Sequence, residues 1–108
     1  GGTGLSSGQR QIVALTRLLL SKPSIWLLDE PTASMDSQLE TRVIQLLKAS
    51  IQKEDTVIIV THKPNILALV DRLIVVNNGK IVMSGPRNDV LSKLSTPTSL
   101  QSTPVKEA

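Results

Sequence analysis

The sequence predicts an α/β fold in which parallel strands with a crossover helix are followed by a C-terminal β-hairpin. Two short apolar runs, 25–28 and 57–60, are continuous rather than alternating, which is typical of strands buried on both faces of a parallel sheet. The pair Asn78-Gly79 lies between two further β-rich runs, and an Asn-Gly pair in this position is the strongest local signal of a hairpin. With 40% hydrophobic residues, the composition is that of a globular chain.

The first element expected is a helix over residues 7–20. Ser6 and Gln9 fit a capping box at its start, and it should end before Pro23 because the residue preceding a proline disfavours helical geometry. The residues expected on its buried side are Ile12, Leu15, Leu18 and Leu19.

A second helix is expected between the two strands, beginning with a capping box formed by Ser37 and Glu40 and ending before the polar stretch 52–55. The apolar residues on one of its faces are Leu39, Val43, Leu46, Leu47 and Ile51. A strand–helix–strand crossover of this kind makes the two strands parallel, and it is right-handed in about 98% of cases.

The remainder of the chain should form short elements. Prolines suit the first position of a helix, and they predict short helices over about 64–70 and about 86–94. The hairpin should occupy residues 72–84. Residues 95–108 are rich in Ser, Thr, Pro and Gln, and we expect them to be a disordered tail.

Composition excludes several classes of function. The chain has no Cys and a single His, which removes disulfides, thiolate catalysis and multi-histidine metal sites. It has a net charge of only +3, one Trp and neither Phe nor Tyr, so it lacks the basic stripes and stacking platforms of nucleic-acid-binding proteins. We therefore expect no nucleic-acid partner.

Polar residues follow both parallel strands where these strands end. Asp29 and Glu30 follow the first strand and His62 follows the second, so they should emerge at the same carboxyl edge, where open α/β sheets bind ligands. Adjacent carboxylates there suit a magnesium-nucleotide site, with Asp29 holding Mg²⁺ and Glu30 accepting a proton from an attacking water. His62 could donate to a phosphate or position that water. Acidic solvated turns and structural histidines are also common, and the residues alone leave this alternative open.

The start of the first helix is a second candidate site. Ser6, Ser7 and Gly8 would present hydroxyls and free amides at the positive end of the helix dipole, which attracts phosphate. An ordinary capping box made by Ser6 and Gln9 explains the same spacing without any ligand.

Taken in order, these segments resemble the nucleotide-binding domain of ATP-binding-cassette (ABC) transporters over residues 1–94. The stretch from Leu5 to Gln11, LSSGQRQ, is similar to the signature motif of that family, usually LSGGQ. Residues 25–30 resemble its Walker B strand with the catalytic glutamate, residues 33–36 its D-loop, and His62 its switch histidine. The resemblance implies the back half of an ABC ATPase domain and a partial P-loop NTPase fold.

The chain departs from the family pattern in two respects. Ser7 stands where the family usually has Gly, and we expect this change to be tolerated because the first turn of a helix does not require glycine. The sequence contains no GxxxxGK[ST] loop, glutamine loop or adenine-stacking aromatic. We therefore expect a piece that begins just before the signature motif and is inactive by itself.

The resemblance also implies a role for each site residue. In this family two nucleotide-binding domains face each other head to tail and enclose two ATP molecules. The signature residues that would contact the ATP of the opposite subunit are Leu5, Ser6, Ser7, Gly8 and Gln9. Asp29 would bind Mg²⁺ through water, Glu30 would polarise the attacking water, and His62 would hold the γ-phosphate and that water in line. Ser34 and Asp36 would couple the two sites.

The function implied is ATP hydrolysis that powers an ABC exporter. Residues 61–64, 69–72 and 78–80 look most like bacterial type I secretion exporters, which implies a location at the cytoplasmic face of the inner membrane. The partners implied are a second copy of the ATPase domain, the transmembrane domain of the same transporter, a periplasmic adaptor and an outer-membrane channel. Two alternatives remain open: a soluble ABC-type ATPase, which would usually show coiled-coil insertions or tandem cassettes, and a non-catalytic regulatory fragment.

Overall fold

The computed structural model describes residues 6–94, and its elements confirm the predicted α/β fold with a parallel strand pair and a β-hairpin. Leu5 and the predicted tail over 95–108 lie outside the described residues. In chain order, the elements are α1 (Ser7–Ser21), β1 (Ile25–Asp29), α2 (Ser37–Ser50), β2 (Thr56–Val60), the 3-10 helix η1 (Pro64–Leu69), β3 (Arg72–Asn77), β4 (Lys80–Pro86) and α3 (Arg87–Leu94).

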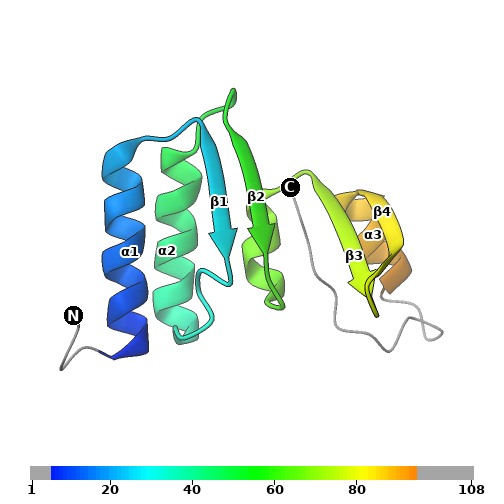
Figure 1. Cartoon of the computed structure of the whole chain (residues 1–108), viewed down its shortest axis with the longest axis horizontal. Helices are drawn as coiled ribbons and strands as arrows, with labels where there is room; N and C mark the ends of the chain where they lie inside the picture. Colours follow the sequence, from blue (N-terminus) through cyan, green and yellow to red (C-terminus); the bar gives the residue numbers. More distant parts are fainter. Residues whose placement is uncertain (1–5, 95–108) are drawn as a thin grey trace.

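The described strands form two separate two-stranded sheets (Figure 1). β1 and β2 are parallel, as the crossover predicts, and their register pairs Asp29 with Val60. β3 and β4 are antiparallel around the predicted turn at Asn78 and Gly79, whose φ angles of +51° and +74° suit the Asn-Gly pair. The second sheet packs with α3 at the far end of the molecule from α1.

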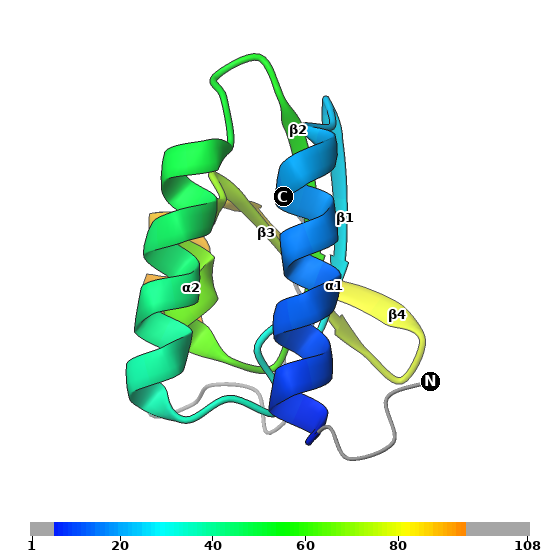
Figure 2. The same cartoon turned by 90° about the vertical axis from the view of Figure 1, so that its left-hand side faces the viewer.

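Helices α1 and α2 lie together beside the parallel sheet and run against its strand direction (Figures 1 and 2). Both helices therefore begin at the edge where β1 and β2 end. The N-termini of both helices, which carry partial positive charge, therefore lie at the same edge as the side chains that follow the strands. Within the described residues, no helix is both long and apolar enough to cross a membrane.

The core is one cluster of buried apolar side chains that come from both sheets and from α1, α2, η1 and α3. Its most deeply buried apolar side chains are Trp26, Leu47, Ile59, Ile66, Leu73, Val75 and Val90. The indole Nε1 of Trp26 donates to Asp55 Oδ2 at 3.1 Å, which satisfies the one polar atom of that side chain.

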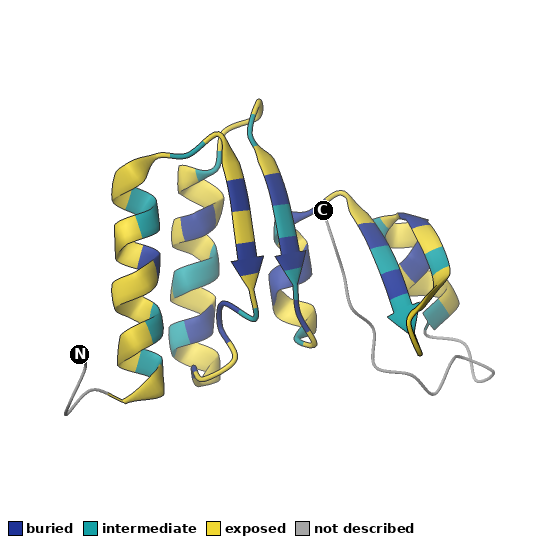
Figure 3. Cartoon of the chain, in the orientation of Figure 1, coloured by how far each residue is buried: buried dark blue, intermediate teal, exposed yellow. Residues whose placement is uncertain are grey.

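The expectation that both parallel strands are buried on both faces is wrong for β1. Its side chains alternate between buried and exposed, and Leu27 is 70% exposed (Figure 3). The cause is that α1 and α2 cover one face of the β1–β2 sheet, while no described element covers Ile25 and Leu27 on the other.

Three predictions about the helices also need correction. Asp36, rather than Ser37, caps α2, because its carboxylate accepts a hydrogen bond from the Leu39 amide at 2.8 Å. The short helix predicted over about 64–70 is present as the 3-10 helix η1, with Pro64 in its first turn, whereas Pro86 ends β4 instead of opening α3, which begins at Arg87. Of the residues predicted to be buried, Ile12 and Leu46 are exposed at the margins of their apolar faces.

We expect the substitution Leu47→Ala to destabilise the fold by about 2–5 kcal/mol, because it leaves a cavity in the core around a fully buried side chain. Leu46→Ala on the same helix is the matched control: this side chain is 55% exposed, and its loss should cost less than about 1 kcal/mol. Urea unfolding of both variants measures the difference, and equal costs would contradict the placement of α2.

Candidate functional site

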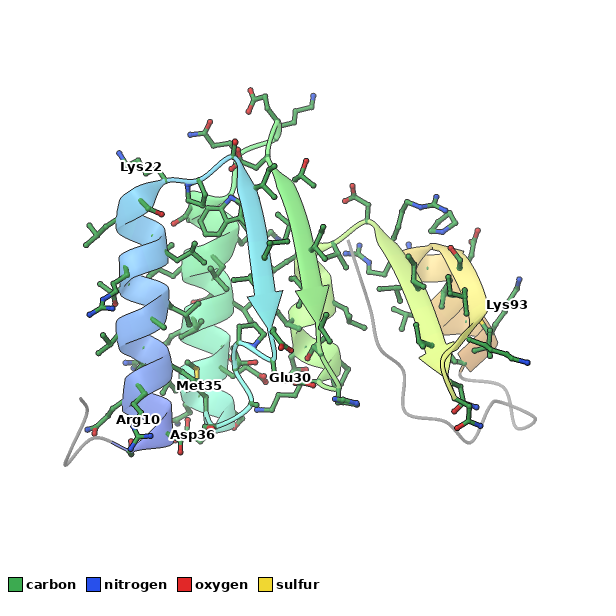
Figure 4. The ribbon with its side chains drawn as sticks, in the orientation of Figure 1. Arg10, Lys22, Glu30, Met35, Asp36 and Lys93 are labelled. Carbon is green, nitrogen blue, oxygen red and sulfur yellow. The ribbon has the colours of Figure 1, made fainter. Side chains whose placement is uncertain are left out.

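The carboxyl edge of the parallel sheet brings Glu30 and His62 together, as the strand order predicts. The Glu30 amide donates to the Val60 carbonyl at 2.7 Å, which continues the strand pairing one residue beyond β1. The Glu30 carboxylate and His62 Nδ1 then form a hydrogen bond, with the imidazole more exposed than the carboxylate. Glu30 lies at the lower end of β1 in Figure 4. A carboxylate and an imidazole in contact at an open edge can hold and orient a water molecule.

The backbone of Glu30 has an unusual conformation. Its φ of +47° lies in the left-handed region, which costs a non-glycine residue about 1–2 kcal/mol. The Glu30 carbonyl accepts two hydrogen bonds, from Gln11 Nε2 at 3.0 Å and from the Ala33 amide at 3.3 Å. The chain around the carboxylate is therefore held from several sides.

Asp29 is the last residue of β1, and its side chain is exposed beside Glu30. Among the described residues, there is no group of three or more His, Cys, Asp or Glu side chains able to hold a metal ion. A single exposed carboxylate nevertheless fits Mg²⁺, which is commonly held by one or two carboxylates together with waters and substrate phosphates.

The start of α1 contains the predicted capping box. Ser6 Oγ accepts from the Gln9 amide at 3.1 Å, and Gln9 Oε1 accepts from the Ser6 amide at 2.9 Å. The Ser6 hydroxyl keeps its own proton, and the amides of Ser7 and Gly8 precede the first acceptor that a helix can provide. Capping and phosphate binding are therefore compatible at this helix N-terminus.

Gly8 has a structural role that the sequence did not reveal. A Cβ added at this position would lie 3.2 Å from the carbonyl oxygen of Ser34. The first turn of α1 therefore packs closely against the loop over residues 31–36. Ser34 itself is exposed, whereas the carboxylate of Asp36 is engaged in capping α2.

Gln11 is a site residue that sequence reasoning missed. Its side-chain amide reaches the Glu30 carbonyl on one side and accepts from the Ser34 amide, at 3.1 Å, on the other. The signals in the sequence were its place at the end of the signature-like stretch and its position one turn after Gly8, on the side of α1 that faces the loop.

A buried carboxylate, that of Glu40, also holds the loop over residues 31–36 in place. Its burial was not predicted from the sequence. Glu40 is 3% exposed and accepts from Thr32 Oγ1 at 2.7 Å and from Asn65 Nδ2 at 2.9 Å. Lys63 Nζ lies 3.4 Å from the same carboxylate and donates to the carbonyls of Thr32 and Met35.

The pKa of Glu40 reflects these contacts. Burial raises it, whereas the hydrogen bonds from Thr32 and Asn65 and the positive charge of Lys63 lower it, and together they hold the pKa below its ordinary value. Glu40 is therefore ionised at neutral pH and pairs with Lys63, the residue that follows His62 in the chain.

Comparison with known proteins identifies relatives of this chain. Residues 1–33 match the family described as ABC transporter. The chain is 36% identical over 101 residues to the type I secretion system ATP-binding protein PrsD of Rhizobium meliloti, covering 94% of this chain and 17% of that protein. It is 40% identical over 94 residues to the multidrug resistance-like ATP-binding protein MdlB of Buchnera aphidicola, covering 87% of this chain and 16% of that protein.

Solved structures agree with these sequence matches. The dimeric structure of MJ0796, described as a bacterial ABC transporter cassette, superimposes with a TM-score of 0.69 and 35% identity, over 79% of this chain and 37% of that chain. A second structure of the same cassette, in a post-hydrolysis state bound to ADP and Pi, gives a TM-score of 0.67 and 36% identity, over 76% of this chain and 36% of that chain. The chain thus spans well under half the length of each of these relatives.

The lowered pKa of Glu40 predicts a specific pH dependence of stability. The stabilising contribution of the ionised carboxylate is fully present above the unfolded pKa, about 4.3, and is lost as the pH falls through the lower folded pKa. We therefore expect the wild type to lose more unfolding free energy than Glu40→Gln between about pH 7 and about pH 3. Urea unfolding across this range measures both slopes.

The exposed carboxylate of Glu54 provides the control. Glu54→Gln should keep the slope of the wild type. Equal slopes for the wild type and Glu40→Gln would contradict the assigned role of Glu40.

Proposed function

Because this chain is part of the ATP-binding domain of an ABC transporter, we propose that the protein binds and hydrolyses ATP to drive transport across a membrane. The single observation that carries the proposal is the contact between Glu30 and His62 at the carboxyl edge of the parallel sheet. Charge and orientation, rather than covalent chemistry, are what phosphoryl transfer requires from a protein, and this pair can supply both.

Each of the residues at this edge has a separate role in hydrolysis. Glu30 accepts the proton of the attacking water, and His62 holds that water and the γ-phosphate in line. Asp29 would hold Mg²⁺, and the metal when bound would neutralise phosphate charge. The phosphate-cradling loop of the family does not occur within these 108 residues.

The start of α1 serves the ATP held by a second ATPase domain. Leu5 to Gln9 would form the signature contact, in which the hydroxyl of Ser6 and the amides of Ser7 and Gly8 donate to the γ-phosphate. Support comes from the dimer formed by the similar cassette and from the free donors in this first turn. Ser34 and Asp36 would couple the two sites, since their loop contacts Gly8 and Gln11 of the same helix.

We propose export by type I secretion, with the ATPase at the cytoplasmic face of a bacterial inner membrane and with its transmembrane domain, a periplasmic adaptor and an outer-membrane channel as partners. Support comes from the similarity to PrsD, a relative that is named for type I secretion. The similarity to MdlB favours a second candidate, export of small molecules in the manner that its multidrug-resistance name describes.

In the full-length protein, Glu30→Gln should lower ATP turnover by about 10²–10⁴-fold and leave ATP binding intact, because the amide can hydrogen-bond water but cannot take its proton. Asp29→Asn should instead weaken the binding of Mg-ATP. Glu54→Gln is the control for loss of a surface carboxylate and should behave as the wild type. Steady-state turnover and nucleotide-binding titrations separate the three variants, and normal turnover in Glu30→Gln would refute the hydrolytic mechanism.

A cellular experiment distinguishes the two transport candidates. If the protein serves type I secretion, Glu30→Gln at the chromosomal locus should abolish one or a few large proteins from the culture medium, whereas sensitivity to small toxic compounds should stay unchanged. Proteomics of the medium and growth inhibition assays measure these outcomes. An unaltered set of secreted proteins, together with increased drug sensitivity, would favour the second candidate.

A further inference from the structure

One side chain connects the two halves of the proposed site. The amide of Gln11 donates from Nε2 to the Glu30 carbonyl at 3.0 Å and accepts at Oε1 from the Ser34 amide at 3.1 Å. A carbonyl can only accept and a backbone amide can only donate, so the orientation of the Gln11 amide is fixed by its partners. Both polar ends of this side chain are therefore used within the site.

The Glu30 backbone needs such support because of its left-handed conformation, with φ at +47°. On its amino side the residue is held by the sheet, through the hydrogen bond to Val60. On its carboxyl side, the shorter of the two hydrogen bonds to its carbonyl comes from Gln11 and the longer from Ala33. Loss of the Gln11 contact would leave the peptide after Glu30 with the weaker bond alone.

The same side chain belongs to the helix whose first turn would meet the opposite nucleotide. Gly8 and Gln11 are one turn apart on α1, and both touch the Ser34 region of the loop. A shift of the α1 start on binding phosphate would therefore be passed directly to the backbone of Glu30. No other described side chain hydrogen-bonds both Glu30 and the loop that follows it.

Building on the proposed function, we propose that Gln11 is a positioning residue that holds Glu30 in its catalytic orientation and links it to the phosphate-binding start of α1. The link needs the donor at Nε2, because the Glu30 carbonyl is its acceptor. An error of about 1 Å in the position of a catalytic group can cost about 10²-fold in rate, so a hydrogen bond of this kind can matter without touching substrate.

Two variants of the full-length protein test this inference. Gln11→Met keeps the length of the side chain and its helix propensity but removes both hydrogen bonds. Gln11→Glu keeps an acceptor for the Ser34 amide but removes the donor to Glu30. We expect both to lower the single-turnover rate of ATP hydrolysis by about 10–100-fold, with ATP affinity within about threefold of wild type and only a small fall in melting temperature from the lost hydrogen bonds.

The control is Arg17→Gln, on an exposed position of the same helix, which should keep the rate of the wild type. Wild-type turnover in either Gln11 variant would overturn the proposal. A melting temperature so low that unfolding alone accounts for the lost rate would also overturn it, since the residue would then act only in folding.

A double substitution shows whether Gln11 acts through Glu30. In a Glu30→Gln background, Gln11→Met should cause no further loss of turnover, because the group that it positions is already gone. Equal fold losses in both backgrounds would overturn the proposal. The proposed function fails on a different result, namely normal turnover in Glu30→Gln alone, so the two failures are distinguishable.

Discussion

The register of the parallel pair β1–β2 is the constraint on which the candidate site depends. Asp29 is paired with Val60, and the Glu30 amide extends this pairing to the Val60 carbonyl, so His62 leaves the sheet next to Glu30. Side chains alternate along a strand, and a slip of one residue would turn the buried side chains of β1 outward. The burial of one face of β1 therefore also fixes which residues reach the edge.

A second constraint lies beneath the edge, where Glu40 is buried with its partners. Placing a carboxylate in the interior costs free energy, and its contacts with Thr32, Asn65 and Lys63 offset that cost. A buried ion pair of this kind adds little net stability to a fold. Their position suggests a geometric role. Lys63 follows His62 in the chain, and Thr32 lies two residues after Glu30, so the cluster ties together the backbone segments that carry the pair.

The sequence predicted features that depend on local signals or strand order: the helices and strands, the Asn-Gly hairpin, the capping box at Ser6 and the meeting of Glu30 with His62. It missed contacts between residues far apart in the chain, such as that of Gln11 with Glu30, because polar residues on a helix give no sign of their partners. The error at Ser37 shows the same limit. Asp36 is an equally good cap one residue earlier. Glu40 is buried against Thr32 and other partners, and its spacing from Ser37 in the sequence cannot reveal them.

The same packing bears on the departure of the signature-like segment from the usual LSGGQ, which we expect to be tolerated. The residue that replaces glycine, Ser7, is exposed, and its backbone amide is as available as that of glycine. The glycine that is kept, Gly8, faces the Ser34 carbonyl at a distance where a Cβ would force the loop to move. Because that loop is bonded to Gln11, a side chain at Gly8 would disturb the surroundings of Glu30 as well as the first turn of α1. The packing against this loop thus constrains Gly8 from within the chain itself.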